Sequence, residues 1–117
     1  MTELDHVLAR LRTFVAERDW DQFHDPKNLT MAVASEAGEL SALLRWVRGE
    51  DSDAFVRLPE NRRAVEDEVA DVGICLLLLC ERASISLPDA MMRKIEANER
   101  KYPVEQAKGR AEKPVQR

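Results

Sequence analysis

The sequence predicts an all-α protein, an antiparallel four-helix bundle assembled as a homo-oligomer. Apolar residues recur at spacings of three and four, which is the period of a helix packed on one side. No segment alternates with a period of two, and no long run is rich in branched or aromatic residues, so strands are not expected. The 117 residues are 44% hydrophobic and include only 4 Gly and 5 Pro, which suits one compact domain.

The first two helices are predicted from their capping residues and apolar spacing. Thr2 resembles a helix start, and the apolar period after it continues to about Arg18. Asp25 followed by Pro26 is typical of an N-cap and a first helical position, so a second helix begins there. Its end is expected at Gly49, and residues 50–54, which are acidic or small, are expected to connect it to the next helix.

Prolines also mark the third and fourth helices. Pro59 can open a helix that ends near Ala83 or Ser84, and its segment 74–79 is apolar nearly all round, which favours burial between identical chains. Pro88 can open the fourth helix, which should stop before Pro103 because the residue preceding a proline avoids the helical region. We expect one domain over residues 1–104 and a polar, flexible tail over residues 105–117.

Composition excludes several classes of function. Eighteen basic and 22 acidic residues give a net charge of −4, which argues against binding to a nucleic-acid polymer through a broad cationic surface. The longest charge-free apolar stretch, residues 72–80, is too short to span a membrane. No signal peptide precedes the first helical pattern, so a cytoplasmic location is expected. Cys75 and Cys80 lie too far apart around a helix to bridge each other and are expected as reduced core thiols.

Two pairs of acidic residues point to a metal site. Glu36 and Glu39 in the second helix, and Glu68 and Asp71 in the third, each share one helix face. Glu36 and Glu68 interrupt apolar stripes that should face inward, and basic residues fall mostly toward the helix ends, so a divalent cation is the better counter-charge. Carboxylates without histidine or cysteine favour Mg²⁺, with Mn²⁺ as a substitute. The stripes comprise Leu29, Ala32, Leu40, Leu43 and Val47 in the second helix and Val65, Val72, Cys75 and Leu79 in the third.

Two other interpretations of these pairs are open. The acids can lie on a solvated face beside charged neighbours, as a single Glu-x-x-Glu commonly does. A di-iron bundle is a competing metal site, but its helices carry Glu-x-x-His, and no histidine follows Glu36, Glu39 or Glu68 at that spacing.

The order of these motifs resembles the MazG-like all-α nucleoside triphosphate pyrophosphohydrolases, and within them the dCTP pyrophosphatase branch. The resemblance covers roughly residues 4–104. It depends on the segment ERDWDQFH at residues 17–24, on EAGEL at residues 36–40, on the second acidic pair and on a C-terminal motif. The C-terminal motif comprises Lys94, Asn98, Lys101, Tyr102 and Pro103.

The resemblance implies a reaction and a ligand set. A nucleoside triphosphate and water give the monophosphate and pyrophosphate, with Mg²⁺ on Glu36, Glu39, Glu68 and Asp71. Bridging cations are also what an anionic triphosphate needs to enter a site made of carboxylates. Glu39 is our candidate for orienting or deprotonating the attacking water.

The resemblance also implies the substrate contacts. Trp20, His24 and Trp46 would form the base pocket. The sequence positions of the two tryptophans, taken alone, indicate core or interface anchors instead. Lys94, Asn98 and Lys101 form one polar stripe that can follow a phosphate chain, and Tyr102 can contact the sugar or simply pack the helix end.

The substrate has several alternatives. Cys75 stands where members of the pyrimidine branch often carry tyrosine, which leaves either a roomier pocket or a gap filled by another side chain. The candidate substrates are therefore dCTP, dUTP and 5-substituted dCTP. The expected role is removal of surplus or modified nucleotides. The rival function is a non-catalytic helical oligomerisation or regulatory module that keeps the acidic pairs as structural metal sites. As an enzyme, the protein would act as a homodimer or homotetramer.

Overall fold

The computed structural model describes residues 1–111, and these form helices and connecting turns with no strand. The all-α prediction is therefore confirmed for this part of the chain. The residues divide into two units, Met1–Ser84 and a second that begins at Ile85, and each is described by itself. The elements are α1 (Glu3–Glu17), the 3₁₀ turn η1 (Asp21–Phe23), α2 (Pro26–Leu44), α3 (Gly49–Arg57), α4 (Pro59–Ala83), α5 (Leu87–Lys101) and α6 (Val104–Ala107).

Local capping explains where the first two helices begin. The Asp5 backbone N–H donates to Thr2 Oγ1 at 3.1 Å, and the Thr2 N–H donates to Asp5 Oδ2 at 2.9 Å, so a capping box opens α1. At α2, the Asn28 N–H donates to Asp25 Oδ1 at 2.8 Å and Pro26 occupies the first turn. Both starts agree with the sequence prediction.

The end of α2 differs from the prediction. The helix stops at Leu44, and Gly49 begins α3 instead of terminating the preceding helix. Residues 50–54, predicted as a connection, are also helical. The acidic first turn of α3, with Glu50 and Asp51, and its basic last turn, with Arg57, complement the helix dipole, which explains why these polar residues form a helix.

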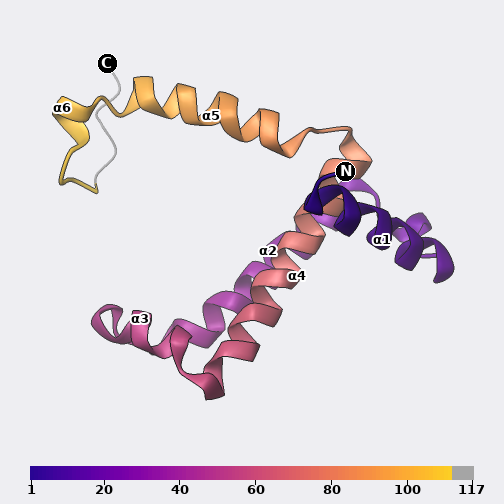
Figure 1. Cartoon of the computed structure of the whole chain (residues 1–117), viewed down its shortest axis with the longest axis horizontal. Helices are drawn as coiled ribbons and strands as arrows, with labels where there is room; N and C mark the ends of the chain where they lie inside the picture. The colour runs from indigo at the N-terminus through magenta and orange to yellow at the C-terminus, as the bar shows by residue number, and fades with distance from the viewer. Residues whose placement is uncertain (112–117) are drawn as a thin grey trace. The chain divides into compact units, whose positions relative to one another are not determined.

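Helix α4 follows the predicted bounds and packs mainly against α2. Pro59 lies in its first turn, and Ser84 ends it in the left-handed region with φ of 57°. Helices α2 and α4 lie side by side and antiparallel (Figure 1). Helix α3 also contacts α4, but less extensively than α2 does. Every residue from 72 to 79 of α4 is half-buried, so no side of this apolar segment is either fully covered or fully exposed.

The second unit contains α5 and α6. Ser86 caps α5, whose last residue is Lys101, as expected from Pro103 two residues later. The start of the tail predicted over residues 105–117 is helical, since Glu105, Gln106 and Ala107 belong to α6. The N–H groups of Gln106 and Ala107 donate to Pro103 O at 3.0 and 2.9 Å in its first turn. The rest of the predicted tail, residues 112–117, lies outside the described residues.

The four-helix bundle and the homo-oligomer stay predictions, because α5 belongs to a different unit from α1, α2 and α4. Over residues 1–111, none of the helices combines the length and the apolar character needed to cross a membrane.

Candidate metal and nucleotide site

Three carboxylates meet where α2 and α4 pack together. Glu36 and Glu39 on α2 and Glu68 on α4 each offer one oxygen, and these oxygens lie within 4.8 Å of one another. We call these three residues the acidic cluster. Glu36 and Glu68 are half-buried and Glu39 is exposed, so the cluster opens to solvent on one side.

Two oxygens of the acidic cluster lack any hydrogen-bond partner. Glu36 Oε2 and Glu68 Oε2 are both buried and unpaired among the described residues. Each of the ion pairs in that part of the chain engages an acid outside the cluster, so no basic side chain neutralises it. Because a buried, unsatisfied carboxylate oxygen is costly, the cluster suits a hard divalent cation that several carboxylates share.

The electrostatics agree with this interpretation. Burial raises the pKa of Glu36, and a hydrogen bond with the Glu39 carboxyl and repulsion from Glu39, Asp71 and Glu68 raise it further. Burial also raises the pKa of Glu68, followed by repulsion from Glu39 and Asp71. Without a counter-ion, therefore, the folded protein disfavours full ionisation of its own acidic cluster.

Asp71, the fourth predicted ligand, lies near the cluster but outside its tight group. It is close enough to affect the pKa of both Glu36 and Glu68. However, its carboxylate is not among the oxygens that lie within 4.8 Å of one another. Asp71 instead lines an adjacent pocket.

This apolar pocket has a volume of about 550 Å³ and lies between α1, the turn after it and α4. Two of the predicted base-binding residues, Trp20 and His24, line it together with Asp71. The Trp20 ring packs edge-on against Phe14, with 5.6 Å between the ring centroids and an interplanar angle of 77°. The remaining lining residues are Val7, Arg10, Leu11, Val15, Ile74, Cys75 and Leu78.

Cys75 connects the pocket to the acidic cluster. It lines the pocket, and burial together with the negative charges of Glu36 and Asp71 raises the pKa of its thiol. The pocket therefore lies close enough to the cluster for Glu36 to affect a residue of the pocket wall.

Trp46, the third aromatic residue predicted for the base pocket, lies elsewhere. It follows the end of α2 instead of occupying its last turn, and 87% of its surface is exposed. The Arg45 guanidinium lies 5.5 Å from the centroid of its ring. The pocket that holds Trp20 and His24 does not include Trp46.

The predicted phosphate and sugar contacts lie together in the second unit. Lys94, Asn98 and Lys101 belong to α5, and Tyr102 is its C-cap, with its N–H donating to Asn98 O at 2.8 Å. The Lys101 ammonium lies 5.5 Å from the Tyr102 ring centroid. These residues thus extend from the middle of α5 to its C-terminal end.

Sequence reasoning missed part of the pocket wall. Phe14, which belongs to the apolar period of the first helix, is 42% exposed and packs on Trp20. Its place three residues before the ERDWDQFH segment was the available signal. Two long-range ion pairs, from Arg12 to Glu81 and from Arg82 to Asp21, had no signal in the sequence.

The fold and the site together define a helical protein that gathers carboxylates from two antiparallel helices beside an apolar pocket. The chain belongs to the MazG-like family, whose model matches residues 48–114. The match includes Glu68 and Asp71 but begins after Glu36 and Glu39.

Several known proteins are similar to this chain over most of its length. It is 41% identical to dCTP pyrophosphatase 1 of Bos taurus over 98 residues, which is 84% of this chain and 58% of the relative. It is 39% identical to dCTP pyrophosphatase 1 of Homo sapiens over 100 residues, 86% of this chain and 59% of the relative. The chain thus spans under two thirds of these relatives. A crystal structure of a pyrophosphatase from Archaeoglobus fulgidus DSM 4304 matches with a TM-score of 0.81 and 41% identity, covering 88% of this chain and 94% of that one.

Proposed function

We propose that this protein is a Mg²⁺-dependent nucleoside triphosphate pyrophosphohydrolase that acts on dCTP or a related or modified pyrimidine nucleotide. The observation that carries the proposal is the pair of buried, unpaired oxygens on Glu36 and Glu68, which face one another from α2 and α4. The names of the similar proteins, dCTP pyrophosphatase 1 and a pyrophosphatase, support the reaction class.

Different residues would bind the metal and the nucleobase. Glu36, Glu39 and Glu68 would hold the metal, and Asp71 would complete the set. When bound there, Mg²⁺ would neutralise triphosphate oxygens and stabilise the pyrophosphate leaving group. Trp20 and His24 would hold the base in the apolar pocket, by stacking and by a hydrogen bond to its edge.

Glu39 is suited to orient and deprotonate the attacking water. It is the exposed member of the acidic cluster, so water can reach its carboxylate. Glu39 would orient the water and accept its proton as the water oxygen bonds to the α-phosphorus. The bond between this phosphorus and the α,β-bridging oxygen then breaks, which releases the monophosphate and pyrophosphate.

The remaining predicted contacts and the assembly are part of the same proposal. We infer that Lys94, Asn98 and Lys101 contact phosphates and that Tyr102 contacts the sugar. Because Trp46 lies outside the apolar pocket of its own chain, we infer that it stacks on the base held by a second copy. Incomplete burial of residues 72–79 and the 53% exposure of Val69 on α4 support assembly as a homodimer or homotetramer, in the cytoplasm. We further propose residues 1–104 as one functional domain.

Pyrophosphate release from a panel of triphosphates tests the proposal. With Mg²⁺ or Mn²⁺, dCTP, dUTP and 5-substituted dCTP should react faster than purine nucleotides. Glu68→Gln should reduce kcat/KM by about 100-fold or more, because it removes a ligand of the metal. Glu66→Gln is the matched control, since Glu66 is exposed on the same helix and pairs with Arg62 at 3.1 Å.

Two results would contradict the proposal. Equal rates for all bases would exclude a pyrimidine pocket. The absence of any hydrolysis would favour the rival function, a helical oligomerisation or regulatory module, in which Glu68→Gln alters stability alone.

A further inference from the structure

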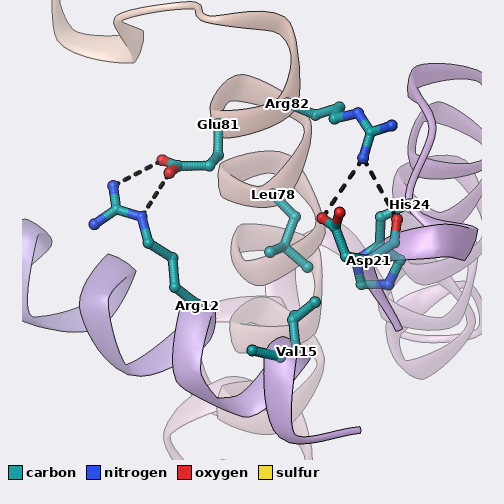
Figure 2. Close-up of a pocket in the computed structure, with 8 residues that line it drawn as sticks. Arg12, Val15, Asp21, His24, Leu78, Glu81 and Arg82 are labelled. Atoms are coloured by element: carbon teal, nitrogen blue, oxygen red, sulfur yellow. Dashed lines mark hydrogen bonds and ion pairs between the residues drawn. The ribbon is translucent and has the colours of Figure 1, made fainter. Parts of the chain in front are cut away.

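Two consecutive residues near the end of α4, Glu81 and Arg82, form ion pairs with the N-terminal segment of the chain. In one pair α4 supplies the anion, and in the other it supplies the cation. Arg12 Nε donates to Glu81 Oε1 at 2.6 Å, and Arg12 Nη2 donates to Glu81 Oε2 at 3.0 Å. Arg82 Nη1 lies 3.5 Å from Asp21 Oδ1 and donates to the Asp21 carbonyl oxygen at 3.4 Å. Figure 2 shows both pairs on either side of one cavity. We call Glu81 and Arg82, with their partners, the charge clamp.

The charge clamp is distinctive among the ion pairs of residues 1–111. Its two pairs join residues 69 and 61 positions apart in the sequence. The other three pairs, such as Arg62 with Glu66, join residues no more than four positions apart. The polar connection between α4 and the α1–η1 segment therefore depends on the clamp.

The order of charges also determines the register of the contact. Glu81 faces the cationic Arg12 on α1, and Arg82 faces the anionic Asp21 on η1. If the segment shifted so that the partners exchanged, Arg12 would face Arg82 and Asp21 would face Glu81. Such like-charge contacts are unfavourable, so the clamp selects one placement of the segment.

Apolar contact alone leaves that placement less constrained. Val15 on α1 and Leu78 on α4 lie between the two ion pairs and line the same cavity of about 510 Å³ (Figure 2). Val15 is the one buried residue of α1. Because dispersion and burial are not directional, this contact resists separation more than sliding.

The segment that the clamp holds carries one wall of the apolar pocket. Phe14 on α1, Trp20 and His24 line that pocket opposite Asp71 and Cys75 on α4. The turn between α1 and α2 is shaped locally, with Asp19 in the left-handed region at φ of 53° and Gln22 Nε2 donating to Asp19 O at 3.0 Å. Local bonds thus define the shape of the turn, whereas the charge clamp determines where it lies against α4.

We propose that Glu81 and Arg82 are positioning residues that set the separation between the aromatic wall of the pocket and α4, and thereby its selectivity for the nucleobase. Neither residue lines the apolar pocket, so each acts through Arg12 or Asp21 on the residues that do. The part of the inference that concerns nucleobases rests on the proposed function; the part that concerns the position of Trp20 does not.

Fluorescence quenching tests the position of Trp20 without any activity. In a Trp46→Phe background Trp20 is the single tryptophan, and it is 44% exposed in the folded chain. Arg82→Asp and Asp21→Arg should each increase the quenching of Trp20 by acrylamide. The double variant, which restores opposite charges, should return it toward the parent value, and Arg62→Ala should leave it unchanged. Equal quenching in all variants, or no recovery in the double variant, would overturn the proposal.

Steady-state kinetics on the same charge substitutions, made in the chain that keeps Trp46, test selectivity. Each single variant should raise KM for the preferred triphosphate about threefold to fivefold, which is the loss expected from one exposed ion pair, with kcat within about twofold. The ratio of kcat/KM between pyrimidine and purine triphosphates should fall and recover in the double variant. An unchanged ratio would refute the role in selectivity. If the parent hydrolyses no triphosphate, the proposed function fails, and the quenching result alone decides the positioning role.

Discussion

Replacing Glu68 by glutamine should remove the dependence of thermal stability on divalent metal. Glu68 Oε2 is buried and unpaired, and Glu36, Glu39 and Glu68 each offer one oxygen within 4.8 Å of the others. Glutamine keeps nearly the same shape but carries no charge. The variant should therefore melt above the wild type in chelator, because repulsion is relieved, and below it in excess Mg²⁺, because a ligand is lost.

The magnitude follows from linkage. A metal that binds only the folded state stabilises it by about 2.7 kcal/mol at one hundred times its dissociation constant. For a chain of 117 residues, 1 kcal/mol corresponds to about 3 to 6 °C in Tm. Mg²⁺ at that concentration should thus raise the Tm of the wild type by about 8 to 16 °C.

Thermal unfolding followed by circular dichroism, in chelator and across millimolar Mg²⁺ and Mn²⁺, measures both effects. Glu66→Gln should keep the full metal-dependent rise, since Glu66 is exposed and outside the acidic cluster. A wild-type Tm that neither metal changes, or a Glu68→Gln variant that responds as the wild type does, would refute the assignment of the cluster to a metal.

Three further predictions concern pH, base stacking and the core. Burial and repulsion raise the folded-state pKa values of Glu36 and Glu68 above the ordinary 4.5, so protonation favours the folded protein. In chelator its Tm should fall as pH rises above about 4.5, and a rise in Tm would contradict the pKa directions. Trp46→Ala should raise KM by about 2- to 10-fold with little effect on stability, because Trp46 is 87% exposed; an unchanged KM would argue against stacking. Leu29→Ala should destabilise the fold by about 2 to 5 kcal/mol in urea unfolding, since Leu29 is only 3% exposed; a loss below about 1 kcal/mol would show that its neighbours collapse into the gap.

Local chemistry made much of the fold predictable. The starts of α1, α2 and α4 depend on residues adjacent in sequence, such as the capping box at Thr2 and prolines in the first turns of α2 and α4. The end of α2 was placed too late because Gly49 suits a helix terminus on either side. The sequence contains no local signal that distinguishes a C-terminal stop from the start of α3.

The candidate site was predictable in composition but not in arrangement. Helical spacing placed Glu36 and Glu39 on one face of α2, and the apolar stripe indicated that Glu36 points inward, as its buried oxygen confirms. The same spacing put Asp71 beside Glu68, yet Asp71 lies outside the tight group. Its position depends on how α2 and α4 cross, which no property of α4 alone specifies.

The sequence by itself determined that this protein is helical, that it belongs among proteins with paired acids on neighbouring helices, and which side chains those acids are. These features depend on residues three or four positions apart, whose relation a helix makes regular. The tertiary structure alone decided that Glu68 meets Glu36 and Glu39, and that Glu81 and Arg82 hold Arg12 and Asp21. These contacts join residues tens of positions apart, and their geometry arises only when packing brings separate helices together.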